Sequence, residues 1–430
     1  MFILGQLENL LYTPEAVSTL QKLYGIEPEM IDRQQKRYLH LSELFREQFP
    51  EQKEASFFST PGRTEIGGNH TDHQRGNVLC ASVDLDILAL AAPNGDNVIR
   101  LKSEGFPNMD VIELSSLDPR EEEREHSSSL IRGIAAAFCQ RGYLVGGLDI
   151  YTTSCVPKGS GLSSSAAFEI LVSTVLDHLY NGDCISPVER AVISQYAENV
   201  YFGKPSGLMD QCGCSVGGII TIDFEDRERP DVKPLSADFT TSGYGLVITH
   251  TGGSHADLTG DYASIPTDMK QVAEFFNCDV LREVDPEDFY RNLSELRSRC
   301  SERALLRTIH FFEDSARVEN QVAALEAGDF DSFLRLVNES GISSWTKLQN
   351  IWSVKEPSEQ PMALALALSS HLLGGQGACR VHGGGYAGTI QAFVPHALMN
   401  HYADGMRAVF GNDAVAELNI RNIGSCRIDI

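Results

Sequence analysis

The sequence predicts an α+β protein with two domains and a cleft between them. Its 430 residues exceed the length at which a single hydrophobic core usually stops growing. A hydrophobic share of 42% is enough to fill complete cores. Predicted strands and helices follow one another without the regular alternation of a doubly wound sheet. We expect a helical extension at 1–55, a first domain at 56–230 and a second at 231–430, with the boundary in the acidic segment DFEDRERPDVKP.

The first half of the chain changes from helix to strand near residue 55. Before that point, apolar residues recur among charged ones at helical spacing, which indicates a helical cover: Tyr38, Leu41, Leu44 and Phe45. From about 55 to 115, short β-rich runs such as VLCASVDLDILALAAP are separated by Gly, Pro and Asn. The run GLDIYTTSCVP is a further strand that ends at Pro157.

Helices dominate the second half. A helix begins at Ser163, with apolar residues at i, i+3, i+4 and i+7, and PVERAVISQYAENVYF follows as a second one. SVGGIITIDF and GYGLVITH read as strands on either side of the expected boundary. A long helical region at about 285–340, the helix EQPMALALALSSHLL, a glycine-rich turn and the strand TIQAFV complete the pattern.

Charge and cysteine content exclude several classes of protein. A formal net charge of −24 disfavours a nucleic-acid partner, and an anion such as ATP needs a local site of backbone N–H groups, basic residues and a cation. The ten cysteines are scattered, as expected for reduced cytosolic thiols. No signal peptide and no membrane-length apolar run is present, so we expect a cytoplasmic protein.

The segment PKGSGLSSSAAFEI, residues 157–170, leads from a strand through glycines and serines into a helix N-terminus. Exposed N–H groups, the positive end of the helix dipole and glycines that allow close approach are what a phosphate requires. Serine hydroxyls add donors and a hard oxygen ligand for Mg²⁺. A serine-rich helix cap is the alternative interpretation. The segment is not a Walker A loop, because it lacks the GK[ST] ending.

The pattern P-x-x-x-G-L-S-S-S-A resembles the second motif of the GHMP kinases, in nearly the wording of the galactokinases. The resemblance implies that the loop binds the phosphates of ATP, with Ser165 as a magnesium ligand. The expected nucleotide-binding residues are Pro157, Gly159, Ser160, Gly161, Leu162, Ser163, Ser164, Ser165 and Ala166.

Other segments resemble galactokinase motifs in the same order along the chain. The galactokinase signature is similar to PGRTEIGGNHTDHQRGNV (61–78). Two further galactokinase motifs are similar to AENVYFGKPSGLMDQ (197–211) and to HADLTGDY. The glycine motif beside the phosphate loop is similar to RVHGGGYAGTIQAFV (380–394). By this resemblance Asp210 is the catalytic carboxylate, Arg63 stabilises charge beside it, and Glu198 is the second magnesium ligand. The implied sugar-binding residues are Asn69, His70, Asp72, Gly207 and Tyr262.

The resemblance implies the two-domain GHMP kinase fold, with a mixed sheet and helices carrying the phosphate loop, a C-terminal ferredoxin-like α/β sandwich, and the active site in the cleft between them. It implies a magnesium-dependent transfer of the γ-phosphoryl of ATP to a sugar hydroxyl, as from galactose to galactose 1-phosphate. The expected partners are a small sugar and ATP, without nucleic acid or membrane, and a monomer is compatible with the sequence.

Departures from the family concentrate in the expected sugar site. Asn69 stands where galactokinases have Glu, Glu65 where they have Asn, and His73 where they have Tyr, while KLQNIWSVKEP replaces the family's DYEVSCPELD. We therefore expect an altered sugar pocket. A kinase for a different monosaccharide or sugar derivative, and a non-catalytic sensor of sugar and ATP, are the alternatives.

Three further patterns are weaker. Gly383-x-Gly385-x-x-Gly388 opens a strand and not a helix, which argues against a dinucleotide site. The serine-hydrolase pattern around Ser215 lies between a predicted helix and a following strand, the reverse of a nucleophile elbow. His70, Asp72 and His73 lack further ligands that would complete a metal site.

Overall fold

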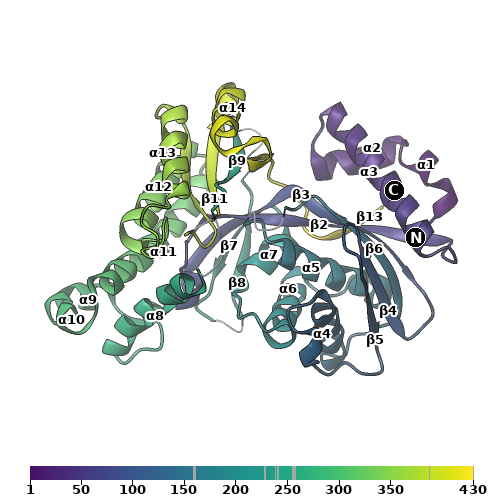
Figure 1. Ribbon diagram of the computed structural model, residues 1–430, viewed down its shortest axis with the longest axis horizontal. Coiled ribbons are helices and arrows are strands. Elements are labelled where there is room, and N and C mark those ends of the chain that lie inside the picture. The colour runs from purple at the N-terminus through teal and green to yellow at the C-terminus, as the bar shows by residue number, and fades with distance from the viewer. Residues whose placement is uncertain are drawn as a thin grey trace.

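The computed structural model describes residues 1–157, 161–226, 229–237, 239, 242–253, 258–386 and 388–429. Within these residues it contains a nine-stranded sheet and a separate four-stranded sheet, each covered by helices (Figure 1). This arrangement confirms the predicted α+β class with two sheet-based halves.

Two long antiparallel strands form the centre of the nine-stranded sheet, β2 (Glu54–Gly67) and β3 (Asn77–Pro93). One half of β3 pairs with β6 (Leu148–Ser154) and the other with β7 (Ile219–Asp223). The remaining strands are β1 (Phe2–Ile3), β4 (Val98–Ser103), β5 (Met109–Glu113), β8 (Asp231–Leu235) and β13 (Cys426–Ile428). The pair β4–β6 is parallel and the other pairs between these strands are antiparallel, so the sheet is mixed, as predicted.

Helices cover both faces of this sheet (Figure 1). One face carries α4 (Ser127–Gln140), α5 (Ser164–Leu176), α6 (Pro187–Tyr196) and α7 (Met209–Val216). The other carries α1 (Leu7–Leu10), α2 (Pro14–Tyr24) and α3 (Pro28–Gln48), which confirms the predicted N-terminal helical cover.

The long apolar run of β3 follows from this double coverage. Leu88 and Leu90 pack against the N-terminal helices, whereas Ala89 and Ala91 face the core beneath α4–α7. Successive side chains of a strand point to opposite faces, so a strand buried on both sides has no polar alternation.

The four-stranded sheet is antiparallel, in the order β10 (Ala378–His382), β11 (Thr389–Pro395), β9 (Tyr244–His250), β12 (Val415–Leu418). Around it lie α8 (Thr259–Phe275), α9 (Pro286–Arg291), α10 (Leu293–Arg299), α11 (Glu302–Glu326), α12 (Phe330–Ser343), α13 (Pro361–Leu373) and α14 (Met399–Phe410). The helical region predicted at 285–340 thus corresponds to α9–α12, and the helix predicted from EQPMALALALSSHLL corresponds to α13.

The chain crosses between the two sheets more than once. Strand β8 begins at Asp231, beyond the expected boundary, yet it pairs with β7 in the large sheet, and β13 returns to β2 from the C-terminal end of the chain. The division at residue 230 remains a proposal, and by strand pairing a boundary between β8 and β9 fits better.

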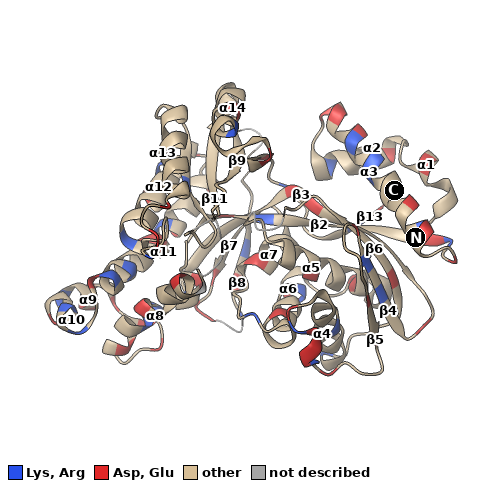
Figure 2. Ribbon diagram, viewed as in Figure 1, with Lys and Arg blue, Asp and Glu red and all other residues tan. Residues whose placement is uncertain are grey.

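Charged residues of both signs are spread over the outer helices (Figure 2). None of the helices in the described residues combines the length and the apolar character that crossing a membrane requires.

Candidate active site

The phosphate loop joins strand β6 to helix α5, as predicted from the sequence. Gly159 and Ser160, two of the expected nucleotide-binding residues, lie outside the described residues. Gly161 has a φ of +73°, and a Cβ there would lie 2.9 Å from Nδ1 of His382. Glycine is therefore required where the loop packs against strand β10.

Ser163 precedes the first turn of α5 and brings the loop to the predicted catalytic carboxylate. Its backbone lies in the left-handed region, with φ +58° and ψ +53°, a conformation that a non-glycine residue adopts at some cost. Its hydroxyl donates to Oδ2 of Asp210, at 2.5 Å. The strained residue thus lies at the functional site.

Asp210 lies in the first turn of α7 and is fixed from two sides. Arg63, from strand β2, donates to Asp210 Oδ1 through Nε, at 2.9 Å, and through Nη2, at 2.5 Å. The third guanidinium nitrogen of Arg63, Nη1, donates to the carbonyl of Gly161. Arg63 is buried, whereas about a third of the Asp210 side chain is exposed, so the carboxylate is open to a substrate.

The electrostatics of this group keep Asp210 ionised. Burial alone raises the pKa of the carboxyl, but the Arg63 guanidinium and the hydrogen bond from Ser163 outweigh it, so the pKa is lowered. At neutral pH, Asp210 is a carboxylate that can accept a hydrogen bond from a hydroxyl group.

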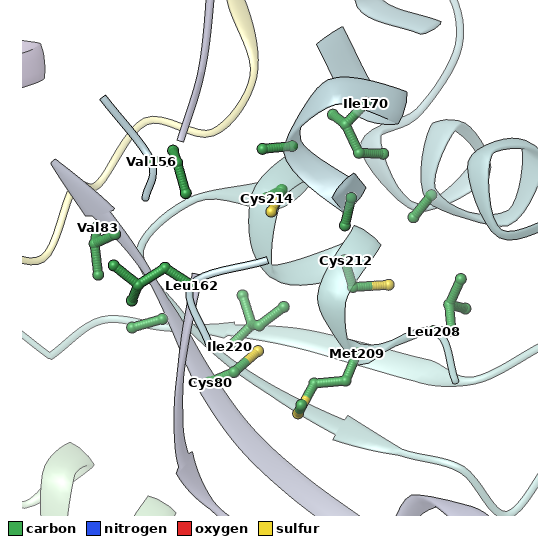
Figure 3. Close-up of a cluster of buried hydrophobic side chains, with 14 of the residues drawn as sticks. Cys80, Val83, Val156, Leu162, Ile170, Leu208, Met209, Cys212, Cys214 and Ile220 are labelled. Atoms are coloured by element: carbon green, nitrogen blue, oxygen red, sulfur yellow. The ribbon is translucent and has the colours of Figure 1, made fainter. Parts of the chain in front are cut away.

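An apolar cluster packs against both the loop and α7. Cys212 and Cys214, both on α7, and Leu162 of the loop pack with Cys80 and Ile220 of the sheet (Figure 3). Burial raises the pKa of Cys80 to about 12, so this thiol stays protonated. The loop and helix α7, which carry the predicted catalytic residues, therefore pack on one core.

Glu198, the second predicted magnesium ligand, is buried in the π-helical turn that follows α6 (Ala197–Phe202). Its Oε1 accepts from Nζ of Lys204 at 2.7 Å, and its Oε2 accepts from Ser206 and from Nε2 of Gln211 at 2.9 Å. The same Gln211 nitrogen donates to Oε2 of Glu169 at 3.0 Å. Two carboxyl groups are thus joined through one amide.

Glu169 is the less obvious member of this pair. It lies on α5 four residues after Ser165, is fully buried, and its Oε1 has no hydrogen-bond partner among the described residues. Burial, reinforced by the negative charge of Glu198, raises its pKa well above the usual range. Ser165 itself is exposed on the first turn of α5.

The predicted sugar side brings together segments that are distant in sequence. A Cβ at Gly207 would lie 2.5 Å from Oδ2 of Asp72, so the turn before α7 closely approaches this carboxylate. His70 is bonded through Nε2 to the carbonyl of Gly384, at 2.9 Å. Tyr262, from α8, donates its hydroxyl to the carbonyl of Gly385 at 2.9 Å.

His70 is neutral in this setting. Burial, together with the nearby His73, lowers the pKa of His70 to about 4. Because a carbonyl can only accept, the bond to Gly384 places the proton on Nε2 and leaves Nδ1 as an acceptor.

Asn69, the departure expected to face the sugar, is fully buried and bonded within the protein. Its Nδ2 donates to Oε1 of Glu65 at 2.8 Å and to the carbonyl of Gly383 at 2.9 Å. Its Oδ1 accepts from Nδ2 of Asn350 at 2.8 Å and from Oγ of Ser344 at 3.2 Å. Protein groups thus occupy both N–H donors and both lone pairs of the amide.

The two departures Asn69 and Glu65 are therefore neighbours in space. Glu65 also forms a buried ion pair with Nη2 of Arg380, at 3.0 Å. Galactokinases have a carboxylate at position 69. In this chain the carboxylate is that of Glu65, four residues earlier, and it is paired with the buried guanidinium of Arg380.

Two of the weaker patterns take no part in this group. Ser215 lies within α7, is buried, and donates to the carbonyl of Pro187 at 2.7 Å, so its hydroxyl is not presented as a nucleophile. Gly383 and Gly385 lie in the turn between β10 and β11, not before a helix, so they form no dinucleotide site.

Sequence reasoning missed three residues that the structure brings to this group, Glu169, Lys204 and His382. All three lie inside the quoted motifs, and a charged residue within a buried helical face was the available signal for Glu169. His382 belongs to the 380–394 segment that the resemblance places beside the phosphate loop, and its bonds to Thr64 and to Thr389 are seen only in the fold.

Comparison with known proteins agrees with the arrangement of these residues. Residues 129–218 match the model of the GHMP kinases N terminal domain, and residues 43–93 match the galactokinase galactose-binding signature. The chain is 30% identical over 337 residues to a galactokinase of Glaesserella parasuis serovar 5, covering 78% of this chain and 84% of that one. It is 29% identical over 360 residues to a galactokinase of Streptomyces coelicolor, covering 83% and 89%.

Solved structures show the same fold. The crystal structure of Lactococcus lactis galactokinase complexed with galactose aligns with a TM-score of 0.76 at 24% identity, over 92% of this chain and all of that one. The Methanococcus jannaschii mevalonate kinase aligns with a TM-score of 0.60 at 14% identity, over 85% and 98%. With the Arg63–Asp210–Ser163 group at the start of α5, these findings confirm the resemblance of the motifs: the chain belongs to the galactokinase family and has the GHMP kinase fold.

Proposed function

We propose that this protein is a sugar kinase that transfers the γ-phosphoryl group of ATP to a hydroxyl of galactose or of a closely related monosaccharide. The observation that carries the proposal is the ionised Asp210, bound by Arg63 and Ser163 at the N-terminal end of helix α5. Family membership and the galactokinase names of the relatives support the substrate class.

Each residue of the group has a role that follows from its chemistry. The free N–H groups at the start of α5 and the hydroxyls of Ser164 and Ser165 bind phosphate oxygens. Asp210 orients the attacking hydroxyl and accepts its proton. Arg63 keeps Asp210 ionised and offsets negative charge that develops during transfer. Because phosphoryl transfer proceeds through a loose transition state, orientation contributes more than early deprotonation, which suits a carboxylate of lowered pKa.

The donor set fits a magnesium ion. Ser165 and Glu198 offer the hydroxyl and carboxylate oxygens that Mg²⁺ prefers, and the unpartnered Oε1 of Glu169 lies in the same acidic group. When bound, the ion neutralises charge on the phosphates of ATP. Lys204 occupies one oxygen of Glu198 and therefore has to give it up for that oxygen to bind the metal.

On the acceptor side, Asp72 and the Nδ1 atom of His70 are acceptors for sugar hydroxyls, and Tyr262 and Gly207 shape the wall. Asn69 does not have a free amide for this purpose. The altered pocket is therefore expected to bind one sugar hydroxyl more weakly than the pocket of galactokinases that have Glu at this position. We also propose that the protein acts in the cytoplasm, and a monomer is the simplest assembly for it.

The direct test is release of ADP with a panel of monosaccharides in the presence of Mg²⁺ and ATP. We expect turnover with at least one sugar, and a loss of about 10²-fold or more in Asp210→Asn with ATP binding retained. Asn keeps an oxygen for Arg63 and can donate to Ser163, so the fold should persist. Ser215→Ala should leave turnover unchanged. Wild-type turnover in Asp210→Asn excludes this mechanism, and binding of ATP and sugar without ADP release favours a sensor.

A further inference from the structure

A second pocket lies between α8, α11 and the segment that follows α12, apart from the catalytic group. Its volume is about 250 Å³, and both tryptophans of the chain, Trp345 and Trp352, line it. Tyr386 forms another wall. Trp352 and Gln349 come from KLQNIWSVKEP, the segment that replaces the family's DYEVSCPELD, so this chain builds the pocket from residues of its own.

The frame of the pocket is rigid. The buried Arg307 donates to the carbonyl of Leu348 at 3.0 Å, to Oδ2 of Asp268 at 2.8 Å, and to the hydroxyl of Tyr386 at 2.8 Å. These bonds fix the aromatic wall to α11 and α8 before any ligand arrives. A preformed pocket loses little conformational entropy on binding.

Several polar groups of the lining remain available to a ligand. Arg303 uses Nε and Nη2 for Asp268, and within the described residues its Nη1 has no partner. The exposed amide of Gln349 likewise has no partner in the part of the chain that is described. Gln349 has a φ of +59°, in the left-handed region that glycine or asparagine usually occupies at a helix end, so this position is held at a cost to the backbone.

The lining indicates a neutral, polar ligand with flat apolar faces. Each charged group around the pocket already has a partner of opposite sign: Arg303 and Arg307 share Asp268, and Lys355 lies 3.6 Å from Asp261. A cavity of about 250 Å³ is near the lower end of the size range of ligand pockets, which suits a small ligand such as a single monosaccharide unit. Indole faces pack against the C–H surface of such a ring, while amide, guanidinium and carboxylate groups bond to its hydroxyls.

We propose that this pocket is a second carbohydrate-binding site, which takes one neutral monosaccharide unit, either free or as part of a larger sugar. It does not depend on the proposed phosphotransfer. The pocket and the acceptor side share a wall, because the rings of Tyr386 and Tyr262 meet edge to face with centroids 5.4 Å apart. The two sites are thus neighbours with different linings.

Tryptophan fluorescence tests the proposal directly, since both indoles of the protein lie in this pocket. The full-length protein is titrated without ATP with D-galactose, D-glucose and lactose up to tens of millimolar, and with glycerol as the non-saccharide control. We expect a saturable change in emission with at least one sugar and none with glycerol. Stronger binding of lactose than of galactose identifies a unit of a larger sugar, and the reverse identifies a free monosaccharide.

Variants separate this pocket from the acceptor site. Gln349→Gly removes the amide and relieves the backbone strain at this position, and Arg303→Ala removes the free guanidinium nitrogen. Each variant should raise the sugar concentration at half-saturation by about tenfold. Thr346→Ala, an exposed neighbour outside the lining, should not. The signal should persist in Asp72→Asn and in Asp210→Asn.

The proposal is overturned if no sugar changes the emission, if Gln349→Gly and Arg303→Ala bind as wild type does, or if Asp72→Asn abolishes the signal, because the indoles would then report on the acceptor site. ADP release by the same proteins is measured separately, so an inactive enzyme with an intact titration contradicts only the proposed kinase activity.

Discussion

Replacing Asn69 by Glu restores the residue type that galactokinases have at this position, yet we expect it to destabilise the protein. The side-chain N–H groups of Asn69 bond to Glu65 and to the carbonyl of Gly383, and a glutamate has no such donors. Two buried acceptors then lose a partner, at about 1–3 kcal/mol each. The new carboxyl also meets that of Glu65 at hydrogen-bond distance, so one of the two has to take up a proton. We expect a loss of about 3–5 kcal/mol in the free energy of unfolding.

The exchange at both positions should cost less than the sum of the two single losses. Glu65→Asn alone leaves the buried Arg380 without its carboxylate, again at about 3–5 kcal/mol. Glu65→Asn combined with Asn69→Glu keeps one carboxylate and one amide in contact, so the two losses should couple by about 1–3 kcal/mol.

Urea unfolding followed by circular dichroism measures these changes, with Asn412→Glu as an exposed control for the added charge. Equal midpoints for Asn69→Glu and the wild type, or strictly additive losses in the double variant, would refute the argument from the buried network.

The same variants test which sugar is preferred. We expect galactose to be a poorer substrate of the wild type than another monosaccharide, and the double variant to raise kcat/KM for galactose by about tenfold relative to that sugar. Asn69→Glu alone should gain less, because the carboxyl of Glu65 opposes it. If the wild type already reaches about 10⁴ M⁻¹s⁻¹ or more with galactose and no other sugar does better, the altered pocket does not change specificity.

Three further predictions concern the metal, pH and the sugar wall. Ser165→Ala and Glu198→Gln should each raise the Mg²⁺ concentration that gives half-maximal activity, and unchanged metal titrations in both would exclude the assigned ligands. Burial lowers the pKa of His70 to about 4, so the folded state binds fewer protons than the unfolded state between about pH 4 and 6.5, and stability falls as pH falls through this window. Urea midpoints at pH 7.5 and 5 should therefore differ less in His70→Asn, and an equal difference would contradict this. Gly207→Ala should raise KM for the sugar, because the added Cβ would lie 2.5 Å from Oδ2 of Asp72, and an unchanged KM would remove this contact from the pocket.

Most of the catalytic group was predictable because its chemistry is local. A strand that leads through glycine and serine into a helix positions N–H groups wherever it occurs, and the helix that follows Ser163 has a clear apolar period. The partnership of Arg63 with Asp210 joins residues 147 positions apart, and only the resemblance between motifs brought them together.

The domain boundary shows where composition misleads. The acidic segment with Pro230 reads as a linker, but the strand that follows it pairs with β7. Strand pairing between distant segments leaves no local mark on composition, and the same holds for β13, which joins β2 from the other end of the chain.

Asn69 shows the limit of reasoning from a motif. Its place in the signature suggests a side chain that faces the sugar, but its partners come from Glu65, Ser344, Asn350 and Gly383, in four separate segments. The carboxylate next to Asn69 is that of Glu65, and it is paired with the guanidinium of Arg380. Gly383 begins the turn whose carbonyls bond to His70 and Tyr262 and which ends at Tyr386, in the lining of the pocket with the two tryptophans. The exchange therefore lies next to both proposed sugar sites. The proposed change in sugar preference thus follows from where the carboxylate lies, and it leaves the residues proposed for phosphoryl transfer unchanged.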